Sequence, residues 1–105
     1  MAATSSRCGV VIQVPGDVHV VAPEEKRSIA LEVATILAEI YRVTQEISEA
    51  AEGGDLERIT FLINGISIGT DLISELRCQH PDILIVRLPP STIASLPAPT
   101  YIAIP

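Results

Sequence analysis

The chain has 105 residues and a formal net charge of −6 at pH 7. This length corresponds to a single domain, residues 1–105, because two separate hydrophobic cores would each be too small to be stable. The acidic charge excludes a protein that binds a phosphate backbone through a basic stripe, so we expect no nucleic acid partner. Hydrophobic residues make up 48% of the chain but aromatic residues only 3%. A core of Ile, Leu, Val and Ala therefore favours a parallel sheet covered by helices.

The composition also predicts where the protein is found. No uninterrupted apolar run approaches the roughly 20 residues that a membrane span requires, so we expect no membrane insertion. Residues 1–8 carry no apolar core behind them and do not indicate a secretory signal. Cys8 and Cys78 lack paired spacing, which is typical of a reducing compartment. We therefore expect a cytoplasmic protein.

Two strands are predicted near the start of the chain. The β-branched run at residues 9–14 ends at Pro15 and Gly16, as expected for a strand followed by a turn. Residues 17–21 alternate polar and apolar side chains and predict a second strand, half exposed, at the edge of the sheet. His19 lies on the polar side of this alternation, and we expect it to face solvent.

A long helix is predicted over residues 23–52, because Pro23 and two glutamates begin it and Gly53 follows its end. Its apolar residues recur in alternating steps of four and three, which is the spacing of a heptad seam. Two interpretations follow: the helix breaks near Thr44 and folds over the sheet, or it is continuous and packs against a partner helix. We favour the partner, with these contact residues: Ile29, Val33, Ile36, Ile40, Val43 and Ile47.

An acidic row accompanies this seam. Glu32, Glu39 and Glu46 recur every seven residues along one side of the predicted helix. The row is either a solvated face or a guide for a basic partner helix.

The second half of the chain predicts a strand over residues 58–64, a glycine turn, a helix over residues 69–79 and a strand over residues 83–88. Residues 91–105 form a proline-rich apolar tail, which we expect to be irregular and to pack on the core or on a partner. The partner contacts expected in this tail are Leu96, Tyr101 and Ile102.

The predicted turn carries the chain's main candidate for chemistry. Gly65-Ile-Ser67-Ile-Gly69 matches the spacing of a nucleophile elbow, but the nearest downstream histidine, His80, is expected about 15 Å away at the far end of a helix. We therefore expect no catalytic residue. Free amides at a helix N-terminus can also bind an anion, and the candidate residues for such a site are Asn64, Gly65, Ser67, Gly69 and Thr70.

A metal site and a cofactor are not expected. Cys78, His80 and Asp82 are three closely spaced ligand types across a predicted helix end, without a fourth ligand. The sequence therefore predicts no metal centre.

Residues 58–91 resemble part of a known family. Arg58-Ile-Thr-Phe-Leu-Ile-Asn64, the following isoleucines, and Pro81-Asp-Ile-Leu-Ile-Val-Arg-Leu-Pro89-Pro-Ser91 are similar to the strand–helix–strand of the small central-stalk subunit of vacuolar and archaeal-type rotary ATPases. The resemblance implies a small α/β domain without a catalytic site, which grips the coiled coil of a partner protein in the rotor. The Gly-Phe helix and the charged C-terminal helix of that family are absent from this sequence.

The sequence thus predicts an α/β fold, a small single domain of βαβαβ character with a mainly parallel sheet covered by helices, one of them long. The expected function is that of a non-catalytic interaction or regulatory subunit. Its long helix and its tail are expected to contact a protein partner or a second copy of the chain. The alternative is a small-ligand or anion-binding protein, or an oligomeric enzyme, with its site at residues 64–71.

Overall fold

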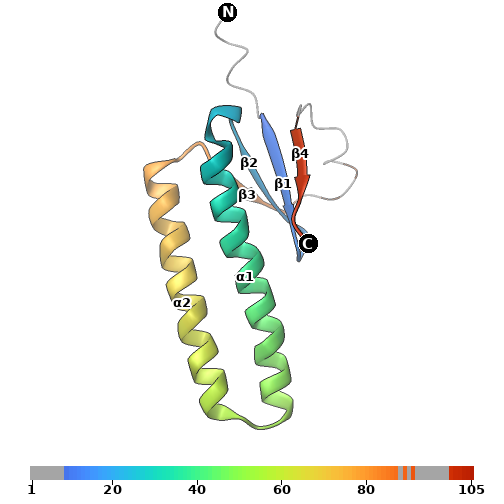
Figure 1. Cartoon of the computed structure of the whole chain (residues 1–105), viewed down its shortest axis with the longest axis vertical. Helices are drawn as coiled ribbons and strands as arrows, with labels where there is room; N and C mark the ends of the chain where they lie inside the picture. Colours follow the sequence, from blue (N-terminus) through green and yellow to red (C-terminus); the bar gives the residue numbers. More distant parts are fainter. Residues whose placement is uncertain (1–8, 88, 90, 92–99) are drawn as a thin grey trace, which may run out of the picture.

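The computed structural model describes residues 9–87, 89, 91 and 100–105. Along the chain, two strands are followed by two long helices and then by two further strands (Figure 1). The elements are β1 (Val10–Val14), β2 (Val18–Ala22), the short 3-10 helix η2 (Glu24–Lys26), α1 (Arg27–Glu52), α2 (Leu56–Gln79), β3 (Leu84–Val86) and β4 (Thr100–Ala103).

The described strands form one mixed sheet in the order β3-β2-β1-β4. β1 and β2 are an antiparallel hairpin whose turn contains Gly16 and Asp17, at φ angles of 93° and 62°. A left-handed backbone is easiest for glycine and tolerated by aspartate, so this turn suits its residues. β3 joins β2 antiparallel, whereas β4 joins β1 parallel. The prediction of a mainly parallel βαβαβ sheet is therefore wrong.

The core lies between one face of this sheet and the N-terminal half of α1. Strand residues at alternate positions face the helix, as a period of two requires. The buried members of the main hydrophobic cluster are Val10, Ile12, Val14, Val20, Ala22, Ala30, Val33, Ala34, Ile73 and Ile83.

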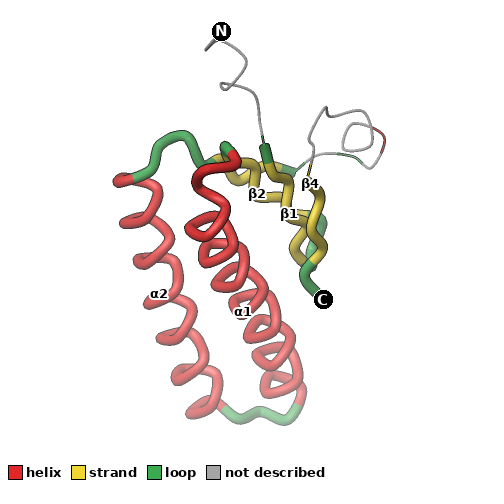
Figure 2. The backbone as a smooth tube through the Cα atoms, turned by 45° about the horizontal axis from the view of Figure 1, so that its top comes forward, coloured by secondary structure: helices red, strands yellow, loops and turns green. Residues whose placement is uncertain are grey.

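The long helix is continuous, so the interpretation with a break near Thr44 is wrong. α1 covers 26 residues, which corresponds to about 39 Å. The molecule measures 58 × 30 × 16 Å, and both helices extend well beyond the end of the sheet (Figure 1). In Figure 2, α1 lies between the sheet and α2, so α2 forms an outer layer.

The two helices are joined by a tight turn. Gly54 has a φ of 71°, and the amides of Gly54 and Asp55 donate to the carbonyls of Ala51 and Ala50 at 3.1 and 3.0 Å. These bonds satisfy carbonyls that the end of α1 would otherwise leave unpaired. Asp55 then caps α2, because its side chain accepts a hydrogen bond from the Arg58 amide at 3.1 Å.

Residues 58–64, predicted as a strand, are helical. The run is rich in β-branched residues. From this run to the end of α2, however, the buried or partly buried apolar residues recur at helical spacing: Ile59, Leu62, Ile66, Gly69, Ile73 and Leu76. An N-cap and a seam on α1 that needs a helical partner outweigh the local β propensity. The helix predicted over residues 69–79 is confirmed as the second half of α2.

Three smaller predictions also change. Residues 18–22 form an interior strand rather than an edge, and His19 is 4% exposed rather than solvent-facing. Of the strand expected over residues 83–88, Leu84–Val86 form β3, and residue 88 lies outside the described residues. Thr100–Ala103 form an edge strand, although an irregular tail was expected there. Prolines next to this strand are tolerated because an edge strand pairs on one side only, so fewer backbone amides are needed for hydrogen bonds.

Candidate functional site

The heptad seam of α1 is packed within the chain itself. Val33 is fully buried in the core, and the other five seam residues are partly buried. A Cβ placed on Gly69 of α2 would lie 3.1 Å from Ile40 and 3.5 Å from Ile36, so the two helices approach closely at this glycine. The helix that this seam contacts is therefore α2.

The candidate anion site does not have the geometry that the sequence predicted. Residues 64–71 lie in the interior of α2, so neither a turn nor a free helix N-terminus is present there. Amides inside a helix donate to carbonyls four residues earlier and are not free for a ligand. Asn64, Gly65, Ser67 and Thr70 are exposed along the helix, whereas Gly69 is buried against α1. The premise of the site, a glycine turn before a helix, is wrong.

The other chemical candidates are scattered. Ser67 is exposed on α2, and its carbonyl accepts a hydrogen bond from the hydroxyl of Thr70 at 2.9 Å. Within the described residues, no three His, Cys, Asp or Glu side chains gather as metal ligands would. In the same part of the chain, the buried Nδ1 atoms of His19 and His80 have no hydrogen-bond partner.

One ion pair ties η2 to the loop before β3. Lys26 Nζ lies 2.8 Å from Asp82 Oδ1, and this hydrogen bond holds the pKa of the Asp82 carboxyl below its ordinary value. Both side chains are partly solvent-exposed. The pair links η2 to the loop before β3.

The predicted contacts of the tail are only partly described. Tyr101 is 50% exposed, and its hydroxyl donates to Gln13 Oε1 at 3.1 Å. Ile102 is partly buried and packs against the core. Leu96 lies outside the described residues.

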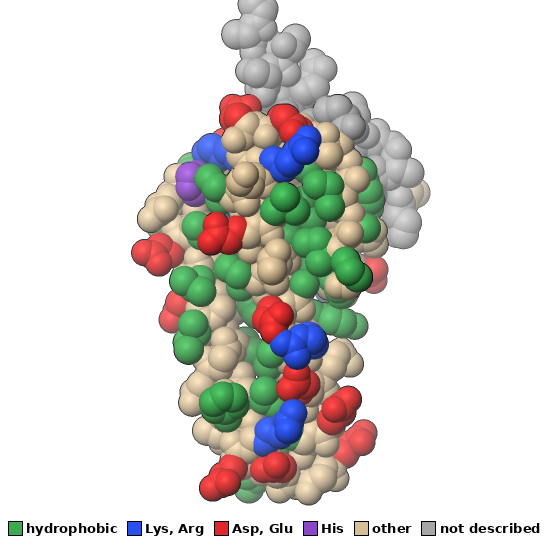
Figure 3. Space-filling model, in the orientation of Figure 1, with side chains coloured by type: hydrophobic (Ala, Val, Ile, Leu, Met, Phe, Trp, Pro, Cys, Tyr) green, Lys and Arg blue, Asp and Glu red, His purple; other side chains and the backbone are tan. Residues whose placement is uncertain are grey.

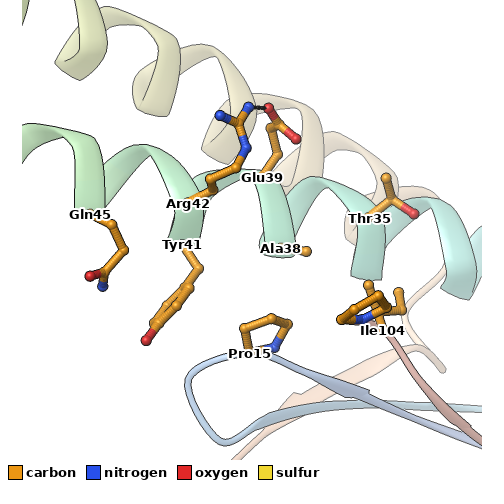
Figure 4. A pocket seen from close by; sticks show the side chains of 9 residues that line it. Pro15, Thr35, Ala38, Glu39, Tyr41, Arg42, Gln45 and Ile104 are labelled. Atoms are coloured by element: carbon orange, nitrogen blue, oxygen red, sulfur yellow. Dashed lines mark hydrogen bonds and ion pairs between the residues drawn. The ribbon is translucent and has the colours of Figure 1, made fainter.

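An open groove separates α1 from the β1–β2 turn and the chain end. Pro15 and Tyr41 face each other across it, with Ala38 and Ile104 further along (Figure 4). The ion pair of Glu39 with Arg42 stands on the rim. A ligand site normally adds a few convergent polar groups to an apolar lining. Here the polar lining residues Thr35, Glu39, Arg42 and Gln45 all come from α1, and Glu39 and Arg42 pair with each other.

The outstanding surface feature is α2 itself. Helices that cover a core are apolar on one side and polar on the other. On α2, large apolar residues are exposed on several sides: Leu56 75%, Phe61 75%, Ile63 52%, Ile68 63% and Leu72 46%. Separate hydrophobic side chains are visible at intervals along this helix in the view of Figure 3.

Three of these residues line up. Phe61, Ile68 and Leu72 are seven and four residues apart, which places them within about 40° of one another around a helix. Gly65 lies between them on the same side, and a Cβ there would meet no atom within 4 Å. We call Phe61, Gly65, Ile68 and Leu72 the apolar row.

A ladder of ion pairs runs beside α2 along α1. Arg42 contacts Glu39 and lies 2.6 Å from Glu46. Glu46 in turn lies 3.1 Å from Arg58 of α2. The basic groups that Glu39 and Glu46 of the acidic row meet therefore come from α1 itself and from α2.

By length and composition alone, α2 could cross a membrane, and 11% of its most apolar 18-residue window is buried in this fold. The sequence prediction missed the first half of this helix because the apolar run at residues 58–64 also fits a strand with two buried faces. The signal that could have revealed it is the spacing of the residues that contact α1.

Comparisons with protein-family models, with curated proteins and with solved structures found no match to this chain.

Proposed function

We propose that this chain is a non-catalytic protein-interaction module, and that its docking surface is the apolar row on α2. The observation that supports the proposal is the exposure of Phe61, Ile68 and Leu72 on a well-formed helix. Fully burying one such side chain is worth about 1.5–3 kcal/mol. From their exposed fractions, covering the three would contribute about 3–5 kcal/mol before the costs of association.

A protein partner fits this surface better than a lipid bilayer does. Asp71 and Glu75 lie on α2, and the charged residues Glu39, Arg42 and Glu46 run alongside on α1. A charged residue at the centre of a bilayer costs at least about 2.5 kcal/mol. A protein interface accepts an apolar centre with charges at its rim.

The expected role agrees in kind with the sequence prediction of an interaction subunit, but the surface is different. The predicted seam on α1 is occupied by α2, so the exposed face of α2 takes its place as the contact surface. Membership of the rotary-ATPase stalk family stays a prediction, and the proposal does not depend on it. The strand–helix–strand unit of that family would require a strand at residues 58–64, where α2 is helical.

A photo-crosslinking amino acid at position 61 tests the proposal in the cells that make the protein. We expect covalent adducts with protein when the probe replaces Phe61. The matched control places the same probe at Glu49, an exposed position on α1. No protein adduct at position 61, or the same adducts at both positions, would contradict the proposal.

A further inference from the structure

We infer that the apolar row is covered by a second copy of this chain, with α2 of each copy packed in parallel about a two-fold axis. This inference rests on the proposed function and names the partner. It is carried by three features of α2: the area of its outer surface, the glycine in the row, and the charges on either side of the row.

The area is sufficient for a dimer without help from another element. A helix of 24 residues is about 36 Å long and about 10 Å across. Covering one side of such a helix removes roughly 500 Å² of surface from water on each copy, or roughly 1,000 Å² in total. Specific interfaces begin at about this size.

Gly65 has no packing role inside the described part of the chain. At Gly69 a Cβ would meet Ile40 at 3.1 Å, so glycine is needed for contact with α1. At Gly65 a Cβ would meet nothing within 4 Å, although glycine is a poor residue for a helix interior. Its position in the apolar row lets the backbone of another helix approach closely. Two parallel helices related by a two-fold axis would place both copies of Gly65 at the same level.

The charges distinguish the two orientations. At about 100° per residue, Glu57 and Glu75 lie on one side of the row, whereas Arg58 lies on the other side. In a parallel pair opposite sides meet, so Arg58 approaches Glu57 of the second copy at the same level. In an antiparallel pair, the same side of both helices meets, and the start of one helix lies beside the end of the other. Glu57 then approaches Glu75 of the second copy, and the two carboxylates repel each other.

Sedimentation equilibrium of the purified full chain tests the dimer. We expect the parent chain to form dimers and Ile68→Glu to be monomeric, because a charge would be buried in the interface. Ile63→Glu is the matched control: Ile63 is 52% exposed on α2 but lies outside the row. It should remain dimeric, and circular dichroism should show that both variants are folded. A monomeric parent chain, or equal association of the two variants, would overturn the inference.

Cysteine crosslinking tests the orientation. In a background with Cys8→Ser and Cys78→Ser, Phe61→Cys should form a disulfide-linked homodimer on oxidation, because a disulfide requires Cα atoms within about 7 Å. In an antiparallel pair, position 61 would instead lie near position 72. A disulfide that forms only when Phe61→Cys is mixed with Leu72→Cys would overturn the parallel arrangement.

The failures of the two proposals can be told apart. If the pure chain is monomeric but position 61 still gives adducts with a different protein, the dimer inference is refuted and the proposed function is retained. A monomeric chain without protein adducts removes both. If the chain sediments with phosphatidylcholine vesicles and Ile68→Glu abolishes this binding, the apolar row binds a membrane. That result would also refute both proposals.

Discussion

Two glycines four residues apart on α2 provide a matched pair of substitutions. Glycine in a helix interior is less favourable than alanine by about 1 kcal/mol. Gly65→Ala should therefore raise the free energy of unfolding by about that amount, because its new methyl meets no atom within 4 Å. Gly69→Ala gains the same helix propensity, but its methyl would lie 3.1 and 3.2 Å from two carbons of Ile40.

Overpacking of this kind costs about 1–3 kcal/mol. Ile40 meets the new methyl with the flexible end of its side chain, so the cost should fall toward the lower part of that range. We expect Gly65→Ala to be more stable than Gly69→Ala by about 1–2 kcal/mol.

Urea denaturation followed by circular dichroism measures this difference. Both substitutions are made in the Ile68→Glu background, so that self-association does not contribute to the measured stability. Equal effects of the two substitutions would refute the packing of Gly69 against α1. A loss of stability in Gly65→Ala would instead point to a turn at this position, as the sequence alone predicted.

Three further predictions concern the fold. Asp55→Ala removes the N-cap of α2 and should cost about 0.5–2 kcal/mol in urea denaturation, whereas an unchanged midpoint would mean that the cap is not formed. Ile12→Ala, at a fully buried position, should cost about 2–5 kcal/mol, and Ile68→Ala in the dilute monomer should cost far less; equal costs would contradict the assigned core. The lowered pKa of Asp82 means that its pair with Lys26 contributes stability above the ordinary value of 3.8, which is lost as the pH falls through the lowered pKa. In Lys26→Met, the urea concentration at the midpoint of unfolding should therefore fall less steeply as the pH is lowered. An unchanged pH dependence would refute this contribution.

The elements near the start of the chain were predictable from local patterns. The run from Val10 to Val14 is mostly β-branched, and the turn after it contains Pro15 and Gly16. The helix before Gly53 was predictable from its heptad spacing. In these segments the local preference and the tertiary environment favour the same structure.

The strand predicted at residues 58–64 shows where local patterns fail. Its β-branched and aromatic residues favour a strand, but the capping Asp55 and the apolar seam on α1 favour a helix. In the helical conformation, Gly69 of α2 lies against Ile36 and Ile40 of α1, which are partly buried within the chain. Propensity differences are about 1 kcal/mol or less per residue, so the packing of two long helices outweighs them.

The candidate site changed for the same reason. A strand buried on both faces would bury Phe61, and Ile68 fell in the predicted glycine turn, so there was no reason in the sequence to place the two residues on one exposed surface. On a helix that contacts α1 along one side only, the same two residues are exposed. The surface proposed for binding is thus a consequence of the helical conformation and could not be predicted while residues 58–64 were assigned to a strand.

The most direct test of the central claim asks whether the apolar row is covered in the protein as it exists in the cell. Ile68→Cys and Ser67→Cys, each in the cysteine-free background, place a thiol on neighbouring residues that face directions about 100° apart on α2. The measurement is the rate of thiol alkylation in a native extract. The apolar row as a docking surface predicts slower alkylation at position 68 than at position 67, with the difference abolished by urea. Equal rates in the native extract would contradict it.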